Sequence, residues 1–152
     1  MPAFNIVVKV HPLMPDDEPE RVQRLREIGF NALIVDTSDN VPLYQLADYM
    51  LFDYGGPAFG GIYTNKKFVL LNVPQAAQDA LTGTNSPDIL LRDSLTNVEA
   101  GSGELANYLK TGKHWETHME EIAKLRRIYF ADKRGTSAQA AAEAILDLSW
   151  LT

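Results

Sequence analysis

The sequence predicts an α/β fold, in which a parallel sheet carries helices on both faces. Three observations favour this fold. Short runs such as residues 4–10 and 67–72 are apolar without polar alternation, which is typical of strands buried on both faces. Stretches with helical spacing of apolar residues separate these runs. Because strands that alternate with helices are joined by right-handed crossovers, we expect the strands to run parallel.

The expected elements follow one another in regular order. Strands are predicted at 4–10, 32–36, 49–52 and 67–72, with a weaker edge strand at 88–92. Helices are predicted at 19–28, 41–47, 57–63, 104–110, 114–130 and 137–148, with one helical turn at 75–80 and an acidic loop at 14–18. Pro19 and Pro57 suit the first turns of their helices, and Gly29 suits a helix end.

Composition limits the class of protein. The chain has 152 residues, enough for one domain that spans residues 1–152. It contains no cysteine, which excludes disulfides and thiolate metal sites, and we expect no metal or cofactor. The net charge of −6 argues against nucleic acid as a partner. The sequence has no run of eighteen apolar residues and no secretory signal, so a cytoplasmic location is predicted.

The stretch from Leu46 to Phe59 organises the expected sheet. Its apolar run ends at Asp53 and Tyr54, and Gly55 and Gly56 then lead into a helix. A glycine turn at a helix N-terminus leaves backbone N–H groups unpaired at the positive end of the helix dipole. We therefore expect a phosphate or carboxylate to bind there. The alternative is a strand-to-helix turn that binds nothing.

Two further residues are expected at the same sheet edge. Lys9 and His11 stand at the carboxyl end of the first strand, on one face by the two-residue period. Ligands of parallel α/β sheets bind beyond the carboxyl ends of the strands. If the first and third strands are parallel, the cation and the imidazole face the glycine turn and complete an anion site. The alternatives are a lysine that extends to solvent and a loop histidine without a role.

Three segments in order resemble one family. They are KVHP at 9–12, LADYMLFDYGGPAF at 46–59, and the tail from Phe130 through Gly135 to Ser137. This set resembles the CDP-glycerol glycerophosphotransferases of teichoic acid synthesis, whose second domain carries K-x-H-P and then A-D-x-x-x-x-D-Y-S-S. The resemblance implies the C-terminal, Rossmann-like half of a two-domain GT-B transferase, which binds the nucleotide donor.

The resemblance also implies roles for particular residues. His11 is expected to be the catalytic group, which contacts the pyrophosphate and stabilises charge on the CMP leaving group. Lys9 is expected to support His11 or to hold the local fold. Asp53 and Tyr54 belong to the donor-binding motif, with Asp53 expected to hold the turn. Gly55 and Gly56 replace two serines of the family, which keeps the amides and removes both hydroxyls.

The expected partners follow from the same resemblance. They are CDP-glycerol or a related nucleotide donor, and the N-terminal GT-B domain that supplies the general base and half of the cleft. Because a central strand almost at Met1 suggests a domain separated from a longer protein, we expect the isolated chain to transfer nothing. A peripheral contact with the inner face of the membrane is a further expectation, because a cluster of basic residues could bind anionic lipid. The alternative is that these residues form a solvated helix face. The cluster consists of Lys124, Arg126, Arg127, Lys133 and Arg134.

Other interpretations remain open. The second interpretation is the donor half of a sugar-nucleotide GT-B glycosyltransferase that makes capsule or surface polysaccharide, because related GT-B glycosyltransferases share much of this pattern. A noncatalytic α/β interaction module is the third interpretation, and the Gly55-Gly56 replacement favours it. His114 and His118 stand four residues apart, as metal ligands on a helix do, but Glu116 between them does not complete an H-E-x-x-H motif. We therefore expect a surface pair of histidines.

Overall fold

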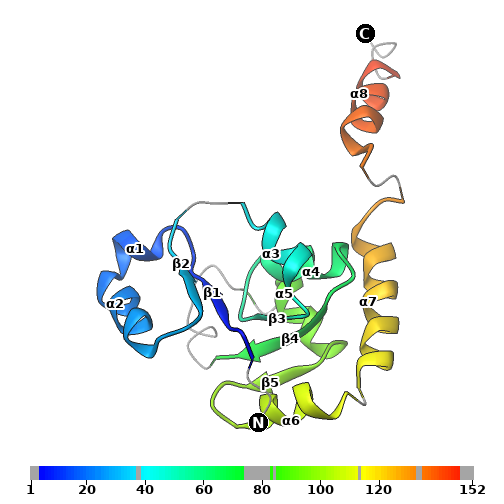
Figure 1. Ribbon diagram of the computed structural model, residues 1–152. Coiled ribbons are helices and arrows are strands. Elements are labelled where there is room, and N and C mark those ends of the chain that lie inside the picture. Colours follow the sequence, from blue (N-terminus) through cyan, green and yellow to red (C-terminus); the bar gives the residue numbers. More distant parts are fainter. Residues whose placement is uncertain are drawn as a thin grey trace. The chain divides into compact units, whose positions relative to one another are not determined.

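Figure 1 shows the computed structural model of the chain, which describes residues 4–36, 39–73, 83, 85–112, 114–132 and 135–147. The chain divides into two compact units, residues 1–42 and residues 43–152. Among the described residues, the backbone ladders form a two-stranded sheet in the first unit and a three-stranded sheet in the second. Every strand pair is parallel, so the α/β fold with parallel sheets is confirmed. A single Rossmann-like sheet, as in a GT-B half, stays a prediction.

The first unit is one βαβ crossover. Strand β1 (Val7–Lys9) pairs with β2 (Ala32–Ile34), and helices α1 (Met14–Asp17) and α2 (Pro19–Ile28) connect them (Figure 1). Helix α2 has the predicted bounds and ends at Gly29, whose φ of 77° suits glycine.

Two details of the first unit differ from the prediction. The acidic loop expected at 14–18 is the short helix α1, because Pro15 and two acidic side chains suit a first helical turn. The strand expected at 4–10 pairs over only three residues, and Val7 remains 49% exposed. The prediction of a central strand buried on both faces was therefore wrong, since β1 belongs to a sheet of two edge strands.

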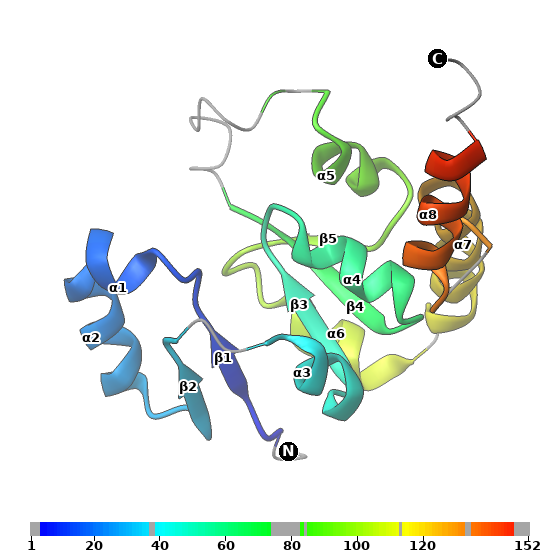
Figure 2. The same cartoon turned by 90° about the horizontal axis from the view of Figure 1, so that it is seen from above.

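The second unit holds a larger sheet. Helix α3 (Val41–Leu46) leads into β3 (Tyr49–Phe52), which is followed by α4 (Pro57–Tyr63) and β4 (Lys67–Asn72), each with the predicted residues at its core. Strand β5 (Asn97–Glu99) completes the order β3-β4-β5, with β4 in the middle (Figures 1 and 2).

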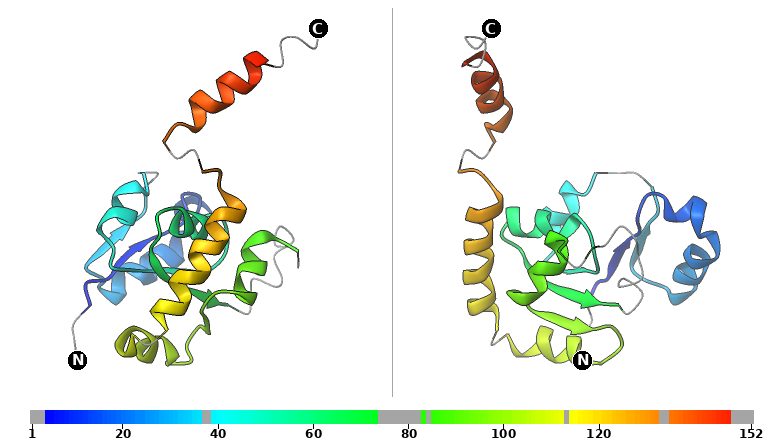
Figure 3. Two further views of the ribbon diagram at one scale, coloured as in Figure 1. Left: turned by 90° about the vertical axis from the view of Figure 1, so that its right-hand side faces the viewer. Right: turned by 180° about the vertical axis from the view of Figure 1, so that it is seen from behind.

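Strand β4 is buried on both faces, as its unbroken apolar run predicts. Phe68 and Leu70 face one core cluster, to which α4 and α7 contribute Ile62 and Ile122. Val69 faces the other cluster, where it packs with Val98 and Trp115, and α6 covers this side. Both α6 (Glu104–Thr111) and α7 (Trp115–Tyr129) lie close to the predicted ranges. Figure 3 shows α7 running across the strands of this sheet.

The predicted edge strand at 88–92 was wrong. The segment forms α5 (Pro87–Leu90) and a 3-10 turn η2 (Leu91–Asp93), because Pro87 opens a helical turn and Leu91 is buried in the core. The fifth strand is β5 instead. The last helix, α8 (Ser137–Asp147), matches the prediction as far as the described residues extend, since Leu148 lies outside them. The turn predicted at 75–80 also lies outside the described residues. None of the helices in the described part of the chain combines the length and apolarity that a membrane crossing requires.

Replacing Gly61 with alanine is expected to destabilise the second unit by about 1–3 kcal/mol. A Cβ at Gly61 would lie 2.9 Å from both the Phe52 and the Phe68 rings, which are packed edge to face. Urea denaturation measures the loss. Gly56→Ala is the matched control, because Gly56 has a φ of −60° and no neighbour within 4 Å of an added Cβ. Equal stability of the two variants would contradict this packing.

Candidate anion-binding site

The residues predicted after the third strand lie together at one edge of the second unit. Asp53, Tyr54, Gly55 and Gly56 follow β3 directly, and the neighbouring strands β4 and β5 end at Asn72 and Glu99. Because the three strands are parallel, these residues share the carboxyl edge of the sheet, where α/β proteins bind ligands. The strand, glycine turn and helix are formed as predicted.

The glycine turn already donates to an anionic group of the chain itself. Gly55 has a φ of 94°, a conformation that favours glycine, and its N–H donates to Asp88 Oδ2 at 2.8 Å. Asp88 is 8% exposed, and its other carboxylate oxygen accepts a hydrogen bond from the Ser86 hydroxyl. A phosphate bound at the Gly55 amide would therefore have to replace the Asp88 carboxylate.

Several groups keep Asp88 ionised. Burial raises the pKa of this carboxyl, but hydrogen bonds from Ser86, Gly55 and its own backbone N–H, with the charge of Arg92, outweigh burial and leave the pKa below its usual value. Asp88 is thus a carboxylate at neutral pH. In this structure the Gly55 N–H of the turn after β3 donates to an internal anion, and the binding of an external anion there stays a prediction.

Arg92 connects the carboxyl ends of β3 and β4. Its guanidinium donates to four acceptors: the carbonyl oxygens of Asp53, Leu71 (3.2 Å) and Asp88 (2.7 Å), and Asn72 Oδ1 (2.9 Å). The guanidinium carbon also lies 3.8 Å from the centroid of the Tyr54 ring, a cation–π contact. Arg92 therefore fixes both the backbone at Asp53 and the ring of Tyr54.

Asn72 extends this network to the third strand. Its Nδ2 donates to Asn97 Oδ1 at 2.9 Å and to Glu99 Oε1 at 3.0 Å, so the side chain bridges β4 and β5. Asn97 Nδ2 in turn donates to the carbonyl oxygens of Arg92 and Leu95. The carboxyl edge of the sheet is consequently held by polar side chains, and sequence reasoning found neither Arg92 nor Asp88.

Lys9 and His11 occupy the carboxyl end of β1, in the first unit. Lys9 Nζ donates to the carbonyl of Asp36, just beyond the end of β2, at 3.3 Å. His11 is exposed, and its Nδ1 accepts a hydrogen bond from the Leu13 N–H at 3.3 Å. The proton of a neutral His11 therefore resides on Nε2, which is the ring donor. Lys9 and His11 belong to the first unit and Asp53–Gly56 to the second, so their expected convergence stays a prediction.

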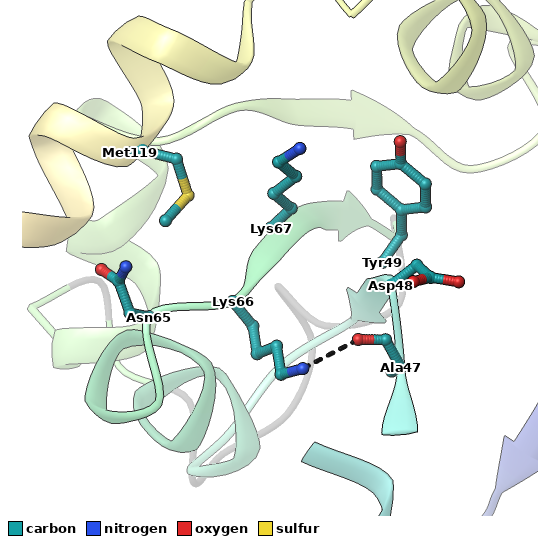
Figure 4. Close-up of a pocket in the computed structure, with 7 residues that line it drawn as sticks. All are labelled: Ala47, Asp48, Tyr49, Asn65, Lys66, Lys67 and Met119. Atoms are coloured by element: carbon teal, nitrogen blue, oxygen red, sulfur yellow. Dashed lines mark hydrogen bonds between the residues drawn. The ribbon is translucent and has the colours of Figure 1, made fainter. Parts of the chain in front are cut away.

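A pocket of about 540 Å³ lies at the amino end of the three-stranded sheet, opposite its carboxyl edge (Figure 4). Tyr49 and Lys67, the first residues of β3 and β4, line it together with Asp48 and Met119. Lys66 also lines it and donates to the carbonyls of Gln45 (3.2 Å) and Ala47 (3.0 Å). Asp48 belongs to the stretch that resembles the transferase family, but β3 separates it from Asp53. This pocket had no signal in the sequence analysis.

The expectation of a surface pair of histidines was wrong for His118, which is only 3% exposed, whereas His114 is exposed. Within the described ranges, no group of three or more histidine, aspartate or glutamate side chains is arranged to hold a metal ion. Of the predicted basic cluster, Lys124 pairs with Glu121 at 2.5 Å, while Lys133 and Arg134 lie outside the described residues.

Comparison with known proteins gives no assignment. No protein-family model matches the chain, and neither a curated protein nor a solved structure matches it. A function is therefore proposed from the residues at the carboxyl ends of the parallel strands.

Proposed function

We propose that the chain is the donor-binding domain of a CDP-glycerol-type glycerophosphotransferase, which acts in the synthesis of teichoic acid or another surface polymer. One observation carries the proposal. Each segment that resembles the donor-binding motifs lies at the carboxyl end of a parallel strand: Lys9 ends β1 and His11 follows it, and Asp53 to Gly56 follow β3. Ligands of such sheets bind at these ends.

In this proposal the donor is bound mainly through its diphosphate. His11 Nε2 donates to a phosphate oxygen and stabilises the charge that develops on the CMP leaving group. The Gly55 N–H donates to a phosphate after exchange with the Asp88 carboxylate, which now occupies it. Arg92 holds the backbone of Asp53 and the Tyr54 ring in place from within the chain.

The acceptor side of the reaction is assigned to a second domain. Activation of an acceptor hydroxyl needs a general base placed against a bound donor, and positioning supplies a large part of such catalysis. We therefore expect the isolated chain to release no CMP from CDP-glycerol with a lipid-linked acceptor. Release above the rate of a His11→Ala control would contradict this assignment.

A specific observation favours a second candidate, a noncatalytic α/β interaction module. The Gly55 amide and the Arg92 guanidinium are both satisfied by groups of the chain. Ligand-observed NMR with CDP-glycerol, CDP-ribitol, UDP-sugars and bare nucleotides separates the candidates. Preference for the CDP-alditols supports the proposal, preference for UDP-sugars indicates a glycosyltransferase, and absence of binding to all of them favours the module.

Replacing Gly56 with aspartate is expected to abolish nucleotide binding without a steric clash, while the new carboxylate also repels the Asp88 carboxylate that occupies the turn. Gly56 has ordinary helical φ and ψ of −60° and −26°, and an added Cβ meets nothing within 4 Å. The new carboxylate would repel a phosphate at ~4 Å by about 4 kcal/mol per charge pair at an effective dielectric of about 20. Thermal melts and CDP titrations measure both effects.

The matched control for this variant is Gly56→Asn, which has nearly the same size and hydrogen-bonding reach but no charge. We expect Gly56→Asn to fold normally and to bind CDP more tightly than Gly56→Asp does. A folded Gly56→Asp variant with the affinity of the parent would place the phosphate elsewhere.

A further inference from the structure

Helix α8 has large apolar side chains that no part of the described chain covers. None of its 11 residues is buried, and Ile145 and Leu146 are 68% and 71% exposed. Isolated helices shorter than about 12–15 residues are marginal in water, because most of the stability of a helix comes from packing its apolar face. We therefore expect α8 to need a partner surface.

The side chains of α8 divide into an apolar arc and an acidic stripe. With 3.6 residues per turn, Ile145 and Leu146 share one side of the helix with alanines from the first two turns. Glu143 and Asp147 stand one turn apart beside this arc, and α8 contains no lysine or arginine. A partner of α8 should therefore combine exposed apolar side chains with positive charge.

The C-terminal end of α7 has these two properties. Arg127 and Ile128 follow Lys124 by three and four residues, so the three side chains lie on one exposed face of the helix. Ile128 is 72% exposed. Lys124 pairs with Glu121, whereas Arg127 forms no ion pair with any residue that the structure describes. This face of α7 thus places an exposed isoleucine beside an unpaired cation.

The two faces are complementary in charge, and every copy of the chain carries both. We propose that α8 of one copy packs on the C-terminal face of α7 of a second copy, with its apolar arc against Ile128 and its acidic stripe beside Arg127. A two-fold axis then forms the same contact twice, as in other isologous dimers. The dimer is independent of the proposed nucleotide site, and the inference stands whether or not the chain binds CDP.

Sedimentation equilibrium of the whole chain measures the association. We expect a monomer–dimer equilibrium whose dissociation constant rises with added salt, because salt screens the charges at the rim of the contact. A chain that stays monomeric at every concentration overturns the proposal, and would mean that α8 packs on its own chain or on a different protein.

Charge reversal identifies the two faces. Arg127→Glu reverses the charge on α7, and Glu143→Lys combined with Asp147→Lys reverses it on α8. Either variant alone places like charges at both contacts of its dimer, so we expect a dissociation constant about tenfold above that of the parent. Arg24→Glu, which reverses an exposed charge on α2, is the matched control and is expected to dimerise as the parent does.

Mixing the two charge-reversed variants tests whether the contact joins different copies. The heterodimer has opposite charges restored at one contact and the parental charges at the other, so we expect its dissociation constant to be close to that of the parent. A contact within one chain could not be restored by mixing. Absence of heterodimers in the mixture therefore overturns the proposal.

The apolar part of the contact is tested with Leu146→Gln. Because Leu146 is exposed, we expect this variant to keep the parental melting temperature of the second unit and to be monomeric where the parent is dimeric. Leu46→Gln is the matched control, since Leu46 is an exposed leucine on α3. Parental dimerisation of Leu146→Gln, or equal weakening by Leu46→Gln, overturns the proposal.

Discussion

Arg92→Ala is expected to lower the free energy of unfolding by about 3 kcal/mol or more. Each hydrogen bond to a charged group contributes roughly 1.5–3 kcal/mol. Arg92 makes four of them, three to the ends of β3 and β4 and one to the Asp88 carbonyl in α5. Its loss leaves the carbonyls of Asp53 and Leu71 without this donor and removes the cation from the Tyr54 ring. Urea denaturation with circular dichroism measures the effect.

Two variants control this experiment. Arg24→Ala removes an exposed arginine from α2 and is expected to change the free energy of unfolding by no more than about 0.5 kcal/mol. Arg92→Lys keeps the charge but cannot reproduce the planar fork, so it should recover only part of the lost stability. An Arg92→Ala variant as stable as Arg24→Ala would show that the network at the carboxyl edge does not hold the strands together.

His118 is expected to make the stability of the second unit depend on pH. Burial lowers its pKa to about 4 in the folded chain, against about 6.5 when unfolded. The unfolded chain therefore binds the proton first as the pH falls. The stability due to neutral His118 is complete above pH 6.5 and is lost between pH 6.5 and 4, by about 1.4 kcal/mol per pH unit.

Denaturation curves collected across this window test the prediction. Other groups titrate there as well, so the measured quantity is the difference between the parent and His118→Phe at each pH. We expect the parent to lose stability relative to the variant as the pH falls below 6.5. A difference that stays constant with pH would mean that His118 is hydrated or exposed in solution.

The local sequence was sufficient to predict a strand where the apolar side chains of the segment itself are buried. The runs at 49–52 and 67–72 form β3 and β4 with the predicted bounds, because polar residues and glycines end each apolar stretch. Strand β5 was missed because Asn97–Glu99 carries a single apolar residue, Val98, whose burial depends on Val69 and Trp115. Residues 88–92 look like a strand by hydrophobicity, but Pro87 starts a helical turn there.

The candidate site was predictable only in part, because its partners are distant in the sequence. The glycine turn after β3 follows from Gly55, Gly56 and Pro57 alone. The anion that occupies the turn, Asp88, lies 33 residues farther along the chain. Arg92 reaches the Asp53 carbonyl across 39 residues. The local sequence around Asp88 and Arg92 does not indicate that either residue contacts the turn, because only the folded sheet brings the strand ends, α5 and η2 together.

The pairing of Asp88 with Gly55 also defines how the proposed site would respond to substitution. The Asp88 carboxylate accepts the Gly55 N–H that a phosphate would need. Asp88→Asn removes the competing charge and keeps the side-chain shape, so we expect this variant to bind CDP more tightly than the parent, whereas Gly56→Asp binds it more weakly. Opposite changes from a residue of the turn and a residue that contacts it would be difficult to explain by general destabilisation.

Calorimetric titration of the chain with CDP and with cytidine tests the central proposal, that the chain binds a nucleotide mainly through its phosphates. We predict that CDP binds more tightly than cytidine, and that its affinity falls with added salt and with His11→Ala. Equal binding of CDP and cytidine, unaffected by His11→Ala, would contradict the claim.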